Sequence, residues 1–157
     1  MCPTDCLETS INEKFKSENY FYTSIGNSFN VDKMSMVHIK KLIIKHEIKN
    51  IDFVLSLDNS FISYVLNKRL NLQDKGLKKY QENINKKKIQ AKIIDQKVNH
   101  QYLLLSYILN DKIKELKVKL ADSIDSITIN GKIYNKKLDD FTYIYSELIN
   151  LEKHNMN

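Results

Sequence analysis

The chain has 157 residues, of which 42% are hydrophobic and 28% are charged. This composition excludes an intrinsically disordered chain, and no apolar run approaches the roughly 20 residues that a membrane span needs. The formal net charge of +6 marks a basic protein, but Arg69 is the only arginine among 25 basic residues, and specific phosphate and base contacts favour arginine. We therefore predict a single cytoplasmic domain over residues 1–157 that binds neither membrane nor nucleic acid.

The first 19 residues are polar and irregular in pattern, with at most one short helix around residues 11–16. They contain both cysteines of the chain, Cys2 and Cys6. The C-x3-C spacing matches neither a zinc ribbon nor a thioredoxin-like redox site. We expect two free thiols in a reducing compartment, and these two residues are only weak candidates for metal ligands.

The next stretch predicts a strand–helix–strand unit. Residues 20–24 are rich in β-preferring side chains, and Gly26 and Asn27 tolerate the positive φ of a turn. Asp32 is the expected N-cap of a helix that extends to about residue 47. The apolar run 51–57 is typical of a strand buried on both faces of a parallel sheet. Such a unit implies a right-handed crossover.

The second half of the chain is mostly helical in pattern. We predict a helix capped by Asp58, a lysine-rich helix over residues 73–90, and a strongly apolar helix over residues 93–110 with a short continuation to Lys117. A strand is expected over residues 126–134. The chain then ends in an amphipathic helix, whose inner face carries Phe141, Ile144, Tyr145, Leu148 and Leu151. Asn130 and Gly131 form either a two-residue hairpin turn or part of one continuous strand.

Open α/β sheets bind ligands at the carboxyl ends of their strands. After the run 51–57 that position holds Ser56, Asp58, Asn59 and Ser60, without histidine, cysteine or glycine. With Thr23 and Ser24 from the neighbouring strand end, they are expected to line a small polar pocket. None of these groups holds zinc firmly. We expect ordered water there rather than an anion, because the Asp58 carboxylate repels anions.

Four segments, in this order, resemble the β-class carbonic anhydrases. Residues 20–27, with Gly26 and Asn27, are similar to a strand that ends in Arg-Asn-Ala-Gly-Asn, and residues 48–56 to the strand that leads into a His-x-x-Cys zinc motif. Residues 98–105, with Gln101 in the middle, are similar to a Val-x-x-Gln-x-x-x-Leu helix, and residues 127–134 to a closing His-Gly-Trp-x-Tyr-Asp strand. The resemblance covers roughly residues 20–145. It implies an α/β fold with a mainly parallel sheet flanked by helices, and we expect the family's N-terminal strand to be lacking.

The resemblance also implies a zinc ion held by Cys, His and Cys beside an Asp–Arg pair. Ser56 stands where the family has the histidine, and Asn59 where it has the second cysteine. The run Cys2-Pro-Thr-Asp-Cys6 stands near the family's first motif, but with a different spacing and no arginine. Lys132 replaces the tryptophan of the closing strand. A hydroxyl and an amide are poor zinc ligands, and without zinc the hydration reaction loses its nucleophile.

These departures lead to three hypotheses. The first is a non-catalytic carbonic-anhydrase-like protein, without a cofactor, that acts in assembly or partner binding as a homodimer or as a subunit of a larger complex. The second is an active carbonic anhydrase that holds zinc through non-standard ligands such as Cys2, Cys6 or a histidine. The third is a lysine-rich module that binds an acidic partner.

Overall fold

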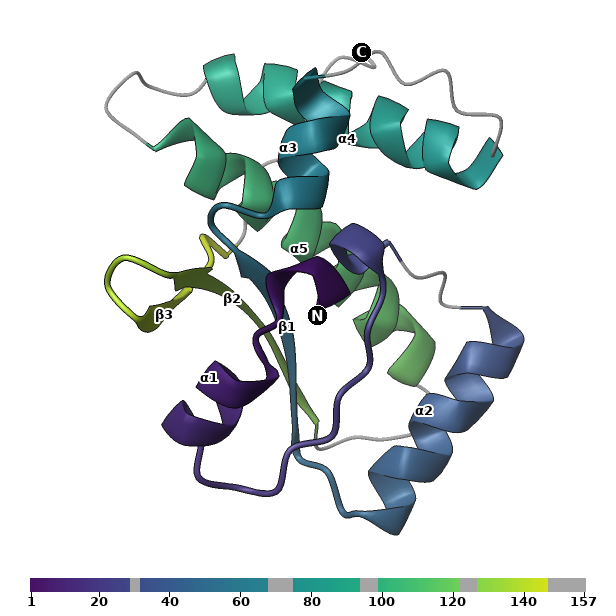
Figure 1. Ribbon diagram of the computed structural model, residues 1–157. Helices are drawn as coiled ribbons and strands as arrows, with labels where there is room; N and C mark the ends of the chain where they lie inside the picture. The colour runs from purple at the N-terminus through teal and green to yellow at the C-terminus, as the bar shows by residue number, and fades with distance from the viewer. Residues whose placement is uncertain (29–31, 68–74, 94–98, 122–126, 147–157) are drawn as a thin grey trace.

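The computed structural model describes residues 1–28, 32–67, 75–93, 99–121 and 127–146 (Figure 1). Its centre is a mixed three-stranded sheet in the order β1-β2-β3, formed by β1 (Asn50–Ser56), β2 (Thr128–Asn135) and β3 (Asp140–Tyr143). β1 and β2 are parallel, with Asn50 opposite Thr128 and Ser56 opposite Tyr134. β3 returns antiparallel along the other edge of β2.

Helices lie on both faces of this sheet (Figure 1). They are α1 (Glu8–Lys14), α2 (Lys33–Lys45), α3 (Ser60–Asn67), α4 (Lys75–Ile93) and α5 (His100–Leu120), with two short 3-10 helices, η1 (Pro3–Asp5) and η2 (Ile25–Asn27). Within the described residues, no helix is both long and apolar enough to cross a membrane.

The alternating side chains of β1 separate two apolar clusters. Phe53 and Leu55 point into the larger cluster, which also contains buried residues of α2, α3, α4 and α5. Val54 points to the opposite face, where it packs with Tyr134 of β2 and with Ile11 of α1. Because a strand in this position has apolar neighbours on both sides, it needs a continuous apolar run. The strand predicted from that run at residues 51–57 is confirmed.

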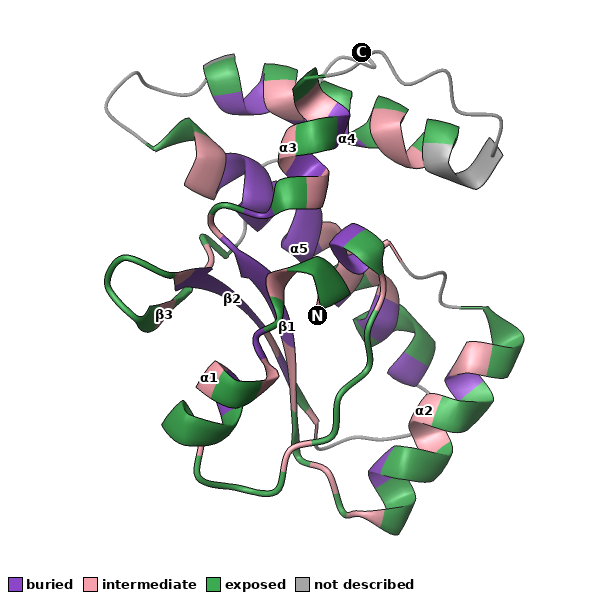
Figure 2. Ribbon diagram, in the orientation of Figure 1, coloured by how far each residue is buried: buried purple, intermediate pink, exposed green. Residues whose placement is uncertain are grey.

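α5 contributes more buried residues to the larger cluster than any other element. Figure 2 shows buried residues along α5 and along the two strands that it crosses. Asn99 caps the helix, because its side chain accepts hydrogen bonds from the N–H groups of Gln101 and Tyr102. The apolar helix predicted at residues 93–110 is confirmed from His100 onward, and it continues without a break to Leu120. Residues 94–98 lie outside the described part.

Three predictions about the sheet and its flanks are corrected. Residues 20–24 are extended but join no strand ladder, and their ring side chains, including Tyr22, are partly exposed. The sheet is therefore mixed rather than mainly parallel. Residues 140–143 form β3 rather than the start of a helix, because they pair with β2 and place Phe141 against Tyr134, with ring centroids 4.8 Å apart. The remainder of the predicted C-terminal helix, beyond residue 146, lies outside the described part.

The two alternatives for Asn130 and Gly131 are also resolved. Both residues lie inside the continuous strand β2. A Cβ atom on Gly131 would come within 3.1 Å of Cδ1 of Ile113 on α5, and closer still to Ile144. The glycine therefore allows the helix and the chain after β3 to approach the backbone of β2 closely.

Candidate functional site at the end of β1

The carboxyl end of β1 is closed by a carboxylate from the beginning of the chain. Oδ2 of Asp5 accepts a hydrogen bond from the backbone N–H of Ser56 at 2.8 Å. Its Oδ1 accepts one from the side-chain amide of Asn59 at 2.7 Å. Burial raises the pKa of Asp5, and these two hydrogen bonds partly oppose the shift. We call Cys2, Asp5, Ser56 and Asn59 the β1-end cluster.

Cys2 is linked to the cluster through the backbone, because the N–H of Asp5 donates to its carbonyl oxygen at 3.2 Å. Its side chain is fully buried. The sulfur accepts a hydrogen bond from the N–H of Gly26 at 3.0 Å and lies 3.0 Å from the hydroxyl oxygen of Thr4. Cys6 is exposed, and its thiol is directed to the carbonyl oxygen of Pro3 at 3.6 Å. Neither cysteine is in a disulfide, as predicted.

The turn η2 ties the preceding extended segment to β1. The amide of Asn27, which is 1% exposed, donates to the carbonyl of Val54 at 2.9 Å. Both Gly26 and Asn27 have positive φ, as the turn prediction requires. The hydroxyl of Tyr80 on α4 donates to the carbonyl of Gly26. This turn is therefore held from the sheet, from the N-terminal residues and from α4.

The predicted pocket residues do not all meet. Ser56 and Asn59 are buried and adjacent, and the hydroxyl of Ser56 donates to the carboxylate of exposed Asp58. Thr23 and Ser60 are exposed. Ser24 is half-buried, and its backbone N–H donates to the carbonyl of Met1.

Asp5 was not among the residues predicted for this site. The sequence does contain an aspartate close to the first cysteine, but no local pattern connects that carboxylate with residues more than fifty positions away. Its role follows from the fold, which brings η1 to the end of β1.

The N-cap of α3 is Asn59 rather than the predicted Asp58. Its Oδ1 accepts a hydrogen bond from the N–H of Ile62 at 2.8 Å, while its amide hydrogens bind Asp5. Asp58 lies one residue too early, and its carboxylate is directed back to Ser56. Asn59 thus supports the helix and the cluster together.

Replacement of Asn59 with alanine is expected to lower the free energy of unfolding by about 2 kcal/mol. The change removes a helix cap, which is worth about 1 kcal/mol, and a hydrogen bond to a buried carboxylate, which is worth about as much again. Asp58→Ala is the comparison variant: it leaves the cap in place and removes only the acceptor of the Ser56 hydroxyl, a hydrogen bond that is worth about 1 kcal/mol. Urea unfolding of both variants measures the difference. A larger loss for Asp58→Ala would restore Asp58 as the cap.

The polar atoms of the cluster are directed at one another rather than at an open space. Both oxygens of Asp5 accept hydrogen bonds, Asn59 uses its oxygen and its amide, and Ser56 uses its hydroxyl and its N–H. In the ranges that the structure describes, no three His, Cys, Asp or Glu side chains lie close enough together to hold a metal ion. As described, the cluster is suited to closing the fold at the end of β1.

Similarity to known proteins was found through the fold. No family model matches the sequence, and no curated protein matches it. Several solved structures match, and the following three are β-carbonic anhydrases. One, described as tetrameric, from Sordaria macrospora has a TM-score of 0.67 at 12% identity over 90% of this chain and 76% of that one. CafA of Aspergillus fumigatus gives 0.65 at 16% identity, over 94% and 73%. CafD of the same fungus gives 0.62 at 12% identity, over 80% and 74%. The chain therefore has the β-carbonic anhydrase fold.

The zinc ion that this fold implies does not fit the residues of the cluster. A zinc site takes four ligands, of which at least three come from cysteine, histidine or carboxylate groups. Cys2 and Asp5 are the only members of the cluster with such groups, and the Asp5 oxygens already bind Ser56 and Asn59. The histidines that the structure describes are not shown beside the cluster: His38 is exposed, Nδ1 of His100 lies 3.0 Å from the carbonyl oxygen of Ala91, and the ring of His46 contacts Tyr20.

Proposed function

We propose that this chain is a non-catalytic protein of the β-carbonic anhydrase fold that acts in assembly or in binding a protein partner, without a metal cofactor. The observation that carries the proposal is the pair of hydrogen bonds from Ser56 and Asn59 to Asp5. These two residues stand where the resemblance places a histidine and a cysteine. The chain's own carboxylate engages both of them, so the end of β1 is filled by a structural interaction.

The test is metal analysis of the purified protein together with a carbon dioxide hydration assay. We expect much less than one zinc per chain, and no rate above the uncatalysed reaction, because nothing in the cluster lowers the pKa of a bound water toward neutrality. An active β-carbonic anhydrase assayed under the same conditions is the positive control. Near one zinc per chain, with hydration that both chelation and Cys2→Ser abolish, would support the alternative of an enzyme with non-standard ligands.

A role in assembly is supported by apolar side chains on the outer surface. Met34 and Ile44 of α2 are 74% and 71% exposed, and Ile25 and Val37 are each 44% exposed. Met34, Val37 and Ile44 follow one another at three- and seven-residue spacing, which places them on one face of α2, and a contiguous exposed apolar face is typical of a surface that another chain covers. The Sordaria macrospora enzyme with the same fold is described as tetrameric.

We therefore predict that the protein is a homodimer or a larger oligomer in solution. Light scattering is expected to give at least twice the chain mass of 18.5 kDa. Ile44→Lys is expected to shift the equilibrium toward the monomer, because it places a charge on the apolar surface. Lys41→Glu on the same helix is the control, which tests whether a change of charge alone has that effect. A monomer at high protein concentration would contradict the prediction.

A further inference from the structure

The positive charge of the chain is concentrated on α4. This helix carries seven lysines and one glutamate, and its net charge of +6 equals the formal net charge of the whole chain. Acidic and basic residues therefore balance over the rest of the sequence. A surface with one sign of charge attracts partners of the opposite sign.

The exposed lysines of α4 have no carboxylate partner in the ranges that the structure describes. Buried Lys87 forms an ion pair with Asp111 of α5, but no such pair is formed by Lys78, Lys79, Lys86 or Lys92, which are exposed. Like charges four residues apart destabilise a helix, and Lys88 and Lys92 have this spacing. An acidic partner would reduce this repulsion.

Several exposed side chains of α4 form one face of the helix. They follow one another at three- and four-residue spacing, which places them on the same side, and they are Lys79, Glu82, Lys86, Ile89 and Lys92. We call this set the lysine face. It spans about 20 Å along the helix axis. In Figure 1, α4 lies at one end of the molecule, apart from the exposed apolar side chains of α2.

A recess between α4 and α5 adjoins the lysine face. Its volume is about 290 Å³, and three of the side chains that line it are Lys79, Lys86 and Lys87. Glu82 and Asp111 also line it, so the lysines are in excess by one. Because Lys87 is occupied by Asp111, the ammonium groups of Lys79 and Lys86 are the ones left for a carboxylate that enters the recess.

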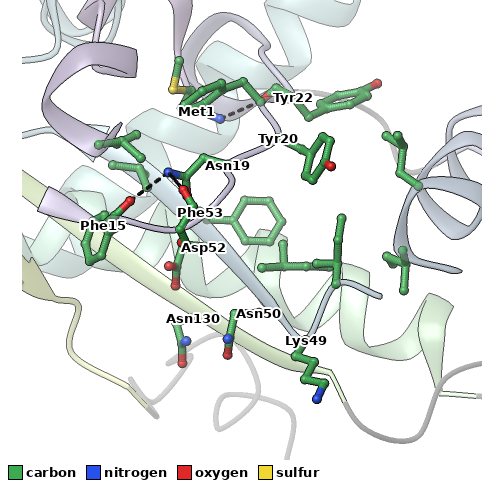
Figure 3. Close-up of a pocket in the computed structure, with 18 of the residues that line it drawn as sticks. Met1, Phe15, Asn19, Tyr20, Tyr22, Lys49, Asn50, Asp52, Phe53 and Asn130 are labelled. Atoms are coloured by element: carbon green, nitrogen blue, oxygen red, sulfur yellow. Dashed lines mark hydrogen bonds between the residues drawn. The ribbon is translucent and has the colours of Figure 1, made fainter. Parts of the chain in front are cut away.

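The larger cavity of the molecule has a different character. It has a volume of about 760 Å³ and lies beside β1, where Figure 3 shows Tyr20 and Tyr22 across from Asp52. Oδ2 of Asp52 accepts a hydrogen bond from Lys132 at 2.8 Å, so these two charges neutralise each other within the chain. The lysines without an acidic partner lie at α4 instead.

The composition of the lysine face favours a protein segment over a phosphate backbone. A polymer with a negative charge on every unit would place one against Glu82 and offer nothing apolar to Ile89, which is 62% exposed. A protein segment offers carboxylates to the lysines and an apolar side chain to Ile89. The helix also contains no arginine, the residue whose planar fork suits phosphate groups.

We propose that the lysine face binds an acidic segment of a different protein. One Asp or Glu side chain of that segment enters the recess beside Lys79 and Lys86, and an apolar side chain packs on Ile89. The partner is a different protein because, outside α4, a second copy has no excess of acidic residues to offer. The proposal rests on the proposed role in partner binding and names the surface and the chemistry of the partner.

The test uses the full chain and a panel of peptides of about eight residues, a length that covers the lysine face in an extended conformation. The peptides carry Asp or Glu at most positions and one Leu or Ile at a varied position. We expect saturable binding with a dissociation constant below about 1 mM at low salt. Raising the salt concentration from about 50 to about 500 mM is expected to weaken binding at least tenfold, because ions screen exposed charges.

Two pairs of substitutions locate the site. Lys79→Glu with Lys86→Glu is expected to weaken binding at least about tenfold. Lys136→Glu with Lys137→Glu, at exposed positions between β2 and β3, makes the same change in net charge and is expected to keep binding. Circular dichroism verifies that each variant is folded. As a measurement that needs no variant, bound peptide is expected to slow hydrogen exchange in α4 more than in α2.

Three results would overturn the proposal. The first is the absence of binding by every peptide of the panel. The second is equal weakening by both pairs of substitutions, which would show attraction by net charge alone. The third is tighter binding of a single-stranded oligonucleotide, or of phosphatidylserine vesicles, than of any acidic peptide. None of these results depends on the zinc and hydration assays, so failure here is distinguishable from failure of the non-catalytic assignment.

Discussion

Gly26→Ala is expected to lower the free energy of unfolding by about 3 to 4 kcal/mol. Gly26 has a φ of 57°, which costs a residue with a Cβ about 1 to 2 kcal/mol. The added Cβ would also collide with the hydroxyl of Tyr80 and come within 3.0 Å of Cδ1 of Phe61. Such overpacking costs about 1 to 3 kcal/mol.

Tyr80 has little freedom to move away from an alanine at this position. Its ring stacks on Phe61 with centroids 6.1 Å apart, and its hydroxyl donates to the Gly26 carbonyl. Burial raises the pKa of this hydroxyl, so it remains a donor throughout the ordinary pH range. An alanine at position 26 would therefore disturb the packing of the turn against both α3 and α4.

Urea unfolding, followed by circular dichroism, measures the effect. Tyr80→Phe provides the control background, because it removes the oxygen that the new Cβ would meet. In that background Gly26→Ala is expected to cost less, because the collision with the hydroxyl is gone, while the backbone term of about 1 to 2 kcal/mol and the close contact with Phe61 remain. An equal cost in both backgrounds would contradict the packing argument, and no cost in either would contradict the positive φ.

Lys132→Met is expected to cost about 3 kcal/mol. Lys132 lies on β2 with its side chain 10% exposed, and its ammonium group is 2.8 Å from Oδ2 of Asp52 and 4.2 Å from the centroid of the Phe15 ring. Methionine nearly keeps the volume but leaves the Asp52 carboxylate without its cation. Removal of one partner of a buried pair costs about 3 to 5 kcal/mol, and the lower value applies because Asp52 is 27% exposed.

The double variant Lys132→Met with Asp52→Asn separates the ion pair from the packing. Because both charges are then absent, we expect it to recover most of the stability that Lys132→Met alone loses. The measurement is a double-mutant cycle by thermal or urea unfolding. Additive losses from the two single changes would show that the pair is not coupled.

The local pattern of the sequence was sufficient for the elements that bury a continuous apolar surface. The run 51–57 predicts β1 because a strand covered on both faces is typically a nearly continuous run of apolar residues. The repeat of apolar residues at three-to-four spacing predicts α2 and α5, since it places them on one face of a helix. Asp32 was likewise predicted as the cap of α2, and its side chain accepts the N–H of Ser35 at 2.7 Å.

The same patterns were ambiguous where two structures satisfy them equally. Phe141 and Ile144 have a spacing that suits a helix, but the free edge of β2 offers backbone partners to this segment and draws it into β3. The residues at 20–24 have strand propensity, but no neighbouring strand is within reach in the described structure, so they remain extended without a ladder. Propensity describes a residue and its neighbours, whereas a strand also needs a partner.

The contents of the β1-end cluster were decided by tertiary structure alone. The sequence placed Ser56 and Asn59 at the end of β1, at the positions where the resemblance implies zinc ligands. It did not show that Asp5 fills the space, because hydrogen bonds across 51 and 54 positions leave no trace in local periodicity. The cavity beside β1 has the same origin: it exists because α2, residues 19–22 and β1 are brought together by the fold.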